Sequence, residues 1–335
     1  MKRNSGPVMA QAPPNIALLK YWGKRDSALN LPVADSLAVC LDDFHTTAKM
    51  QRADAPADSF VWNGQEMGPP YRSRFQRMVR FARERSARDE VIQAEIKSTL
   101  PPRIGLAGSA AAMSAFALAL SEFFDMGLHS RELSALARMG SGSAARSIPD
   151  GFTWWHRGHL TDGTDSFAET ILSHDAWPEL RILLIILDTE GKRVSSTDGM
   201  VRVAQTSPHF EAWTHQCNFL APIMLEAIQA QDFEKLSSLA QSNAQTMHAL
   251  CMTAQPPIVY VSSATLRVLE HLEELRRAHP LFYTLDAGPN PIVFTLDGSL
   301  STIESSLAAS FPRASVQACR PGPGARIVKG NGAIK

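Results

Sequence analysis

The chain has 335 residues, of which 44% are apolar, and its 33 basic and 33 acidic residues give a formal net charge of zero. A chain of this length and composition can bury a large core and is long enough for two domains. The balanced charge argues against a protein that holds nucleic acid or an anionic membrane through its overall charge. We therefore expect a folded protein without a nucleic acid or membrane partner, in which any basic ligand site is local.

The four cysteines, Cys40, Cys217, Cys251 and Cys319, are widely spaced and form no C-x-x-C pair. This spacing argues against a disulfide framework and a zinc site, so reduced thiols in the cytoplasm are expected. The first residues lack the long apolar region of a secretory signal. The uncharged run 104–120 approaches transmembrane length, but its Gly, Ala and Ser content and its opening turn favour a buried helix.

In the first half of the chain, alternation and helical periodicity predict two strand regions and two helices. The strand regions are 28–51 and 92–98, and the helices are 109–124 and 130–139. Four apolar side chains share one face of the first helix: Met113, Phe116, Leu120 and Phe123. Ser130 is expected to cap the second helix, and Gly140 marks its end.

The apolar strand RILLIILD, at 181–188, follows a change in composition, and the domain boundary is placed just before it. The expected domains are 1–175 and 176–335. Beyond this strand the pattern predicts three helices, at 208–230, 232–249 and 262–278, and three strands, at 281–286, 291–296 and 315–320. Because strands and helices do not alternate as a regular βαβ series, the expected fold class is α+β.

The segment APPNIALLKYWGKRD, at 12–26, gathers cationic and aromatic side chains beside an apolar run. Lysines supply mobile charges to phosphate oxygens, while Tyr and Trp form walls that need no partner charge. The residues concerned are Lys20, Tyr21, Trp22 and Lys24. On charge alone two interpretations stay open: a phosphate-binding segment, or an amphipathic edge strand with a solvated basic end.

The segment PPRIGLAGSAAA, at 101–112, places two prolines and a Gly-rich turn at the start of a helix. Exposed N–H groups and the positive end of the helix dipole favour phosphate at such a turn. The segment has neither the Lys-Ser/Thr ending of a Walker P-loop nor a dinucleotide fingerprint. It therefore suits an anion, and a turn that serves packing alone is the alternative.

The segment MGSGSAARSIPDGF, at 139–152, leads from small residues to a single arginine, Arg146. A guanidinium can clamp a carboxylate in bidentate fashion, which a lysine does less well. The alternative is that Arg146 pairs with a structural acid.

Two later loops also carry polar groups. GKRVSSTDGM, at 191–200, offers hydroxyls that can hold phosphate or simply cap a helix. FYTLDAGPNPIVF, at 282–294, predicts a strand, a tight loop and a second strand. Asp286 ends the first of these strands, where its carboxylate can face a cleft, although ordinary turn chemistry explains the same residues.

His248 and Asn243 lie on nearly the same face of a predicted helix. We interpret both mainly as structural, because a lone histidine on a helix is more often packed than functional. No group of His, Cys or acidic residues has the spacing of a metal site, but magnesium bound through nucleotide phosphates needs none. The sequence also lacks a G-x-S-x-G elbow, which disfavours a covalent hydrolase.

Five segments, in order along the chain, resemble those of the diphosphomevalonate decarboxylases of the GHMP kinase superfamily. They are NIALLKYWGKRD, PPRIGLAGSAAA, GSGSAARS, KRVSSTDGM and DAGPN. The resemblance implies a two-domain fold, with a first domain like domain 2 of ribosomal protein S5 and a ferredoxin-like second domain. It also implies ATP-dependent decarboxylation of mevalonate 5-diphosphate to isopentenyl diphosphate, with release of ADP, phosphate and CO₂ and with Mg²⁺ as a cofactor.

The same resemblance implies roles for single residues. Asp286 would be the base for the substrate hydroxyl, Lys20 would reach the reacting groups, and Arg146 would hold the substrate carboxylate. The other expected substrate contacts are Tyr21, Trp22, Lys24, Ser141 and Ser143. The expected ATP contacts are Gly105, Leu106, Ala107, Gly108, Ser109, Ala110, Ser195 and Ser196, and Ser109 is also the candidate for Mg²⁺. A homodimer is the expected assembly.

The chain departs from the family pattern at four positions that usually carry polar residues: Ala34, Ala38, Cys40 and Gly108. These departures leave three alternatives open. They are a phosphomevalonate decarboxylase, a kinase that stops after phosphorylating the 3-hydroxyl, and an inactive GHMP-fold protein that binds a ligand as a regulator. The presence of Asp286 together with Arg146 and Lys20 favours the complete reaction.

Overall fold

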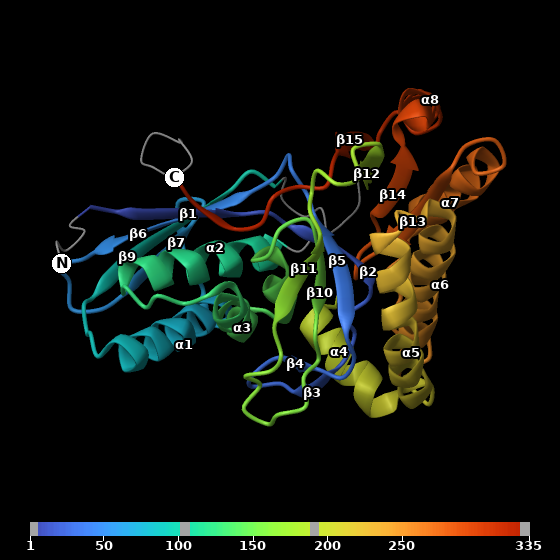
Figure 1. Ribbon diagram of the computed structural model, residues 1–335. Helices are drawn as coiled ribbons and strands as arrows, with labels where there is room; N and C mark the ends of the chain where they lie inside the picture. Colours follow the sequence, from blue (N-terminus) through green and yellow to red (C-terminus); the bar gives the residue numbers. More distant parts are fainter. Residues whose placement is uncertain (1–5, 101–107, 188–193, 329–335) are drawn as a thin grey trace.

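A six-stranded sheet with a layer of three helices on one face forms the first part of the fold (Figure 1). The computed structural model describes residues 6–100, 108–187 and 194–328. In sheet order the strands are β16 (Arg326–Val328), β1 (Val8–Ala12), β6 (Thr46–Arg52), β9 (Ile92–Ser98), β7 (Ser59–Trp62) and β8 (Gln65–Glu66). The helices are α1 (Pro69–Ser86), α2 (Gly108–Phe123) and α3 (Ser130–Gly140).

Helix α2 lies at the centre of this first core. Its small residues let it pack against β1, β6, α1 and α3 at once, and its buried side chains run from Ala110 to Ser121. Phe116 meets Phe75 of α1 edge to face at 4.5 Å between ring centroids. The uncharged run is therefore a buried helix, as its composition predicts. Among the described residues, no helix is long and apolar enough to cross a membrane.

A four-stranded sheet in the middle of the molecule joins the two halves of the chain (Figure 1). Its order is β11 (Ala168–Leu172), β10 (Phe152–Trp155), β5 (Ser36–Cys40) and β2 (Asn15–Leu19). It packs against α5 (Phe210–Gln229) and α6 (Phe233–Met252). The resulting apolar cluster contains residues from both sides of the predicted domain boundary, so one core spans it. A short ribbon of β3 (Lys24–Asp26) and β4 (Leu31–Pro32) and the 3-10 helix η1 (Gly142–Ser147) complete this region.

The last sheet explains why both alternating sets of residues in RILLIILD are apolar. Its antiparallel order is β13 (Leu281–Leu285), β14 (Pro291–Leu296), β12 (Leu180–Ile186) and β15 (Ser315–Cys319). Ile182 and Leu184 join the central core, whereas Leu183 and Ile185 face α7 (Ser263–Leu275) and α8 (Asp297–Ser310). Both faces of β12 are thus buried. Strands and helices in the sequence β12, α7, β13, β14, α8 and β15 give the predicted ferredoxin-like arrangement.

The structure corrects several expectations. The region 28–51 is not one strand but contains β4, β5 and all of β6 except its last residue. His129, not Ser130, is the N-cap of α3, with a reciprocal capping box to Glu132. Helices α1, α8 and α4 (Ser196–Thr206) were not predicted.

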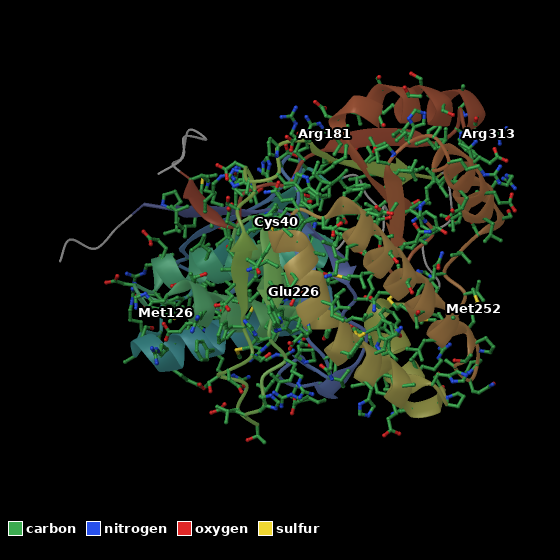
Figure 2. The ribbon with its side chains drawn as sticks, turned by 45° about the vertical axis from the view of Figure 1, so that its right-hand side comes forward. Cys40, Met126, Arg181, Glu226, Met252 and Arg313 are labelled. Carbon is green, nitrogen blue, oxygen red and sulfur yellow. The ribbon has the colours of Figure 1, made fainter. Side chains whose placement is uncertain are left out.

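The path of the chain crosses between the two parts of the fold more than once. The 175/176 boundary falls between β11 and β12, but the chain then returns, and β16 pairs with β1 in the first sheet. In Figure 2, Met126 beside the first core lies across the molecule from Met252 and Arg313. The segment between β15 and β16 connects these two sides, so residues near 326 belong structurally to the first part of the fold.

Candidate active site

A cleft of about 840 Å³ opens between the two parts of the fold. Its walls come from the end of β2, from α1, from the N-terminus of α2, from the segment around η1 and from the start of α4. Asp286, which follows β13, faces it from the second part of the molecule. The cleft therefore gathers the sequence motifs that lie farthest apart in the chain.

An ion pair between Lys20 and Asp286 crosses this cleft. The Lys20 Nζ donates to the Asp286 Oδ1 at 2.7 Å, and the side chains are 2% and 24% exposed. Burial lowers the pKa of Lys20, the charge of Asp286 opposes that shift, and Arg146 adds to it. The carboxylate is thus fixed by a cation on one side while part of it stays open to the cleft, which is the arrangement that a base needs.

Arg146 is a buried cation in the same cleft. Its Nε donates to the Asn15 Oδ1 at 3.0 Å, and an Nη1 donates to the Ser36 Oγ. The Asn15 Nδ2 in turn donates to the Ser147 Oγ at 2.7 Å and to the Ser143 carbonyl at 3.0 Å, which fixes the orientation of the amide. Burial lowers the pKa of Arg146 to about 10, so the side chain stays positive at neutral pH.

No carboxylate within the described ranges forms an ion pair with Arg146. These residues therefore give no support to the interpretation of Arg146 as the partner of a structural acid. A positive group that is 3% exposed and has no ion-pair partner in the described ranges, although the charge of Asp286 stabilises it from nearby, is expected to bind an anionic ligand. Sequence reasoning missed Asn15 as the residue that orients this guanidinium, although it stands in the first motif.

Tyr21 lies against the backbone of η1. A Cβ atom added at Gly142 would come within 2.5 Å of the Tyr21 Oη, so only glycine lets the ring approach this closely. The hydroxyl is buried, lines the cleft and has no hydrogen-bond partner among the described residues. Ser141 and Ser143 flank Gly142 with their hydroxyl oxygens 3.4 Å apart. These three side chains present hydroxyls to one part of the cleft.

Trp22 is placed differently from the other aromatic residue of the motif. Its side chain is 4% exposed and belongs to the central core, where it meets Tyr260 edge to face at 5.9 Å. One edge still lines the cleft, and its Nε1 finds no partner among the residues that the structure describes. Trp22 is therefore mainly a packing residue with one polar atom near the site.

Three cations gather at one part of the cleft wall: Lys24, Arg74 and Arg77. The Lys24 Nζ donates to the Asn30 Oδ1 at 2.7 Å, and burial followed by the charges of Arg74 and Arg77 lowers the pKa of Lys24 to about 8. In the described part of the chain none of the three has an ion-pair partner. Such a cluster binds a multiply charged anion such as a phosphate or diphosphate. Sequence reasoning missed both arginines because it did not predict α1.

The predicted ATP contacts are brought to the cleft only in part. Gly108 and Ser109, at the start of α2, line it, and Ala110 is buried in the first core. Gly105, Leu106 and Ala107 lie outside the described residues. Ser196 lines the cleft, whereas Ser195 is the N-cap of α4, where its Oγ accepts from the Asp198 N–H at 3.1 Å.

An aromatic pair lies farther along the cleft. Trp62 and Tyr71 meet edge to face at 5.8 Å, and the Arg74 guanidinium stands 5.6 Å from the Tyr71 ring centroid. Asn63, Gln65 and Leu100 line the same part of the molecule. Flat apolar walls with nearby amides are suited to a planar heterocycle.

The oxygen donors of the cleft suit a magnesium ion that is held mainly by a nucleotide. Ser109, Ser196 and Thr197 supply hydroxyl oxygens, which hard cations accept as ligands. Within the described ranges, the one convergent group of acidic and sulfur ligands is Asp42, Asp43 and Cys319, which does not line the cleft. The cleft therefore suits a magnesium ion whose ligands come mainly from nucleotide phosphates better than an ion whose ligands come only from the protein.

The departures from the family pattern lie mostly away from the cleft. Ala34, Ala38 and Cys40 are buried and do not line it. The Cys40 thiol donates to the Arg146 carbonyl at 3.4 Å, in the place where a hydroxyl could do the same. Gly108 does line the cleft. Three of the four positions that lack the usual polar residue therefore lie in the packed interior and not at the cleft.

Two family models match consecutive parts of the chain. The diphosphomevalonate decarboxylase-like N-terminal domain matches residues 12–168, and the mevalonate 5-diphosphate decarboxylase C-terminal domain matches residues 182–325. The diphosphomevalonate decarboxylase of Homo sapiens is 36% identical over 328 residues, which cover 91% of this chain and 80% of that protein.

Solved structures give the same result. The structure of MDDEF in complex with MVAPP, AMPPCP and magnesium matches with a TM-score of 0.90 and 31% identity, over 96% of this chain and 99% of that one. Mevalonate diphosphate decarboxylase from Staphylococcus aureus matches with a TM-score of 0.90 and 30% identity, over 96% and 98% of the two chains. Both similarities extend over the two sides of the cleft.

Proposed function

The chain belongs to the diphosphomevalonate decarboxylase family, and from this premise we propose that its cleft converts mevalonate 5-diphosphate and ATP to isopentenyl diphosphate, ADP, phosphate and CO₂. One observation supports this reaction above the others. Arg146, a buried cation without a carboxylate partner in the described residues, lines the same cleft as the partly open carboxylate of Asp286. The first can hold the group that is lost as CO₂, and the second can receive the proton of the hydroxyl.

In the proposed first step, Asp286 takes the proton of the substrate 3-hydroxyl while the hydroxyl oxygen attacks the γ-phosphorus of ATP, and ADP leaves. Lys20 fixes the carboxylate through the 2.7 Å ion pair. Magnesium, which accompanies MVAPP and AMPPCP in the solved MDDEF complex, offsets phosphate charge when bound, and Ser109 would contact it. Gly108 and Ser196 are the further described contacts proposed for the nucleotide phosphates.

In the proposed second step, the bond between the tertiary carbon and the new phosphate breaks, and phosphate leaves with the electron pair. The bond to the carboxylate carbon then breaks, its electrons form the double bond, and CO₂ departs. Arg146 holds the carboxylate in line until this bond breaks, and fixed charges lower the barrier because they need no reorganisation.

The three cations Lys24, Arg74 and Arg77 favour a substrate with a diphosphate over one with a monophosphate. Three cations at one place, without ion-pair partners among the described residues, are offset better by the larger charge of a diphosphate. We assign the substrate diphosphate to this cluster and to the hydroxyls of Tyr21, Ser141 and Ser143. The region of Trp62 and Tyr71, whose aromatic side chains suit a flat ring, is assigned to the adenine of ATP.

The test is an assay of ADP and CO₂ with purified protein, Mg²⁺ and ATP against mevalonate, its 5-phosphate and its 5-diphosphate. Equal amounts of ADP and CO₂ with the diphosphate alone are expected. Activity with the monophosphate would make the protein a phosphomevalonate decarboxylase, and ADP without CO₂ would make it a kinase. No substrate-dependent product at all would favour an inactive ligand-binding protein.

We also propose a homodimer in the cytoplasm. All four cysteines are free and buried, which suits a reducing compartment, and closed two-fold assemblies are common among enzymes of this kind. Light scattering of the purified protein gives the mass that tests the assembly, and a monomer mass would contradict it.

A further inference from the structure

Helix α6 contacts both strands that end in the Lys20–Asp286 ion pair. It packs against β2, which Lys20 follows, and against β13, which Asp286 follows (Figure 1). These strands belong to different sheets in different halves of the chain. The relative position of the two charged groups therefore depends on an element that supplies neither of them.

Asn243 connects α6 to the Lys20 side of the pair. This residue is fully buried, and its Oδ1 accepts from the Lys20 backbone N–H at 2.8 Å. Its Nδ2 donates to the Cys217 Sγ of α5 at 3.6 Å, which fixes the orientation of the amide. The first residue after β2 is thus held by a side chain and not by a neighbouring strand.

His248 connects the same helix to the Asp286 side. Its ring is 6% exposed and meets Tyr260 edge to face at 6.1 Å. Burial followed by the charge of Lys20 lowers its pKa to about 4, and the backbone of Leu285 and Asp286 beside the ring opposes that shift. The buried Nε2 has no hydrogen-bond partner among the described residues. The ring is therefore neutral at neutral pH and adds no positive charge beside Lys20.

We propose that Asn243 and His248 are positioning residues for the phosphoryl-transfer step, because together they hold the two ends of the Lys20–Asp286 pair at their catalytic separation. This inference rests on the proposed function for its effect on turnover. It replaces the interpretation of both residues as packing alone. Neither residue needs to touch the substrate.

Positioning and packing predict different kinetics. A displacement of about 1 Å at a reacting group can cost about 10²-fold in rate, although the ligands still bind. Loss of packing instead lowers the folded fraction and leaves the kcat of the folded molecules unchanged. Comparing the change in kcat with the change in KM, at equal concentrations of folded protein, therefore distinguishes a positioning role from a packing role.

The variant His248→Leu keeps much of the volume and removes both ring nitrogens. We expect kcat to fall by about tenfold or more, with the KM for ATP and for mevalonate 5-diphosphate changed by less than about twofold. His248→Asn, whose amide can donate to the backbone of Leu285 and Asp286, should regain most of the lost kcat. Tyr260→Phe, which keeps the ring that packs on His248, is the control and should leave kcat unchanged.

Asn243→Ala tests the other end of the pair. It leaves the Lys20 N–H without its acceptor, and a similar fall in kcat is expected. Cys217→Ala is the matched control, because it opens a cavity at the same place but keeps the bond from Lys20 to Asn243. Equal kcat in Asn243→Ala and Cys217→Ala, or a kcat of His248→Leu near that of the parent protein, would overturn the proposal.

A measurement that needs no substrate tests this inference independently of the proposed function. The ¹³Cε resonance of Lys20 in lysine-labelled protein, assigned by its loss in Lys20→Arg, reports the pKa of that amine. The groups facing Lys20 are Asp286 from the β13–β14 loop, Arg146 from η1 and the neutral His248 from α6. Among the described groups, Asp286 carries the charge that raises this pKa, so moving it away should lower the pKa in His248→Leu and Asn243→Ala.

An unchanged Lys20 titration in both variants would overturn the positioning role, whatever the substrate proves to be. A parent protein that turns over no mevalonate compound would instead overturn the proposed function, while the titration would still decide the structural claim.

Discussion

Lys24 shows how the surroundings of one residue set the pH range of binding. Its pKa is lowered to about 8 by burial and by Arg74 and Arg77, and its partner Asn30 carries no charge. The free side chain is therefore protonated below about pH 8 and neutral above it. Because only the protonated form attracts phosphate, the KM for the phosphorylated substrate should rise as the pH passes through 8.

Lys24→Arg supplies the comparison, since a guanidinium stays charged throughout this range. Initial rates measured between pH 6.5 and 9.5 should show the rise in KM for the parent protein and a flat KM for the variant. A parallel rise in both proteins would assign the titration to another group.

At the residue scale, the sequence predicted the groups that carry charge and missed those that orient them. Lys20 and Asp286 each follow a strand, Arg146 lies in η1, and all three line the cleft. Each stands in a segment with a recognisable sequence pattern. The roles of three asparagines could not be predicted in this way: Asn15, Asn243 and Asn30. An asparagine's role depends on which group it meets in the folded chain. The placement of Ser195 as a helix cap shows the same limit.

Helix α1 supplies two of the three cations that we propose to bind the substrate phosphates. It brings Arg74 and Arg77 to the wall beside Lys24, and neither has an acidic partner in the described residues. Loss of a hydrogen bond to a charged group costs about 1.5 to 3 kcal/mol, or roughly 10- to 150-fold. Arg74→Ala and Arg77→Ala should therefore raise the KM for mevalonate 5-diphosphate about tenfold or more, with little change in melting temperature.

Arg80→Ala is the control for this helix, because Arg80 is exposed on the side that does not line the cleft. Steady-state kinetics of the three variants give the comparison. If Arg80→Ala weakened binding as much as the other two, the effect would come from the overall charge of α1 and not from the cluster.

Strands and helices were predicted correctly where a strong sequence pattern allowed only one interpretation. β9, β14 and α3 lie where alternation or capping signals placed them, within one residue. Helix α1 was not predicted because arginines stand among its apolar positions Phe75, Met78 and Val79, although these three positions follow helical spacing. The division of 28–51 into several strands depends on pairing with β2 and β1, which no local pattern contains.

The whole molecule is held together by a core that crosses the predicted domain boundary. The sheet of β11, β10, β5 and β2 is covered by α5 and α6, and β16 returns to the first sheet. Residues 1–175 expressed alone would leave that apolar face in water. We expect this fragment to bind a hydrophobic dye and to aggregate, and co-expression with residues 176–335 to restore a compact complex.

Circular dichroism and size-exclusion chromatography check this expectation. A monomeric, cooperatively unfolding 1–175 fragment would contradict a shared core. Sequence alone supported a boundary near 175 because composition changes there, but it could not show that the two sides share one core, since that follows from contacts between distant segments.

In the proposed reaction, the carboxylate of Asp286 receives the hydroxyl proton while ATP and mevalonate 5-diphosphate are both bound in the cleft. The most direct measurement is the rate of substrate-dependent ADP and CO₂ release by Asp286→Asn, with ATP binding followed separately by fluorescence titration. We predict a loss of kcat of about 10²-fold or more, since general base catalysis contributes about that much, with the Kd for ATP unchanged within about twofold. A variant that retained a near-normal rate would show that Asp286 is not the base.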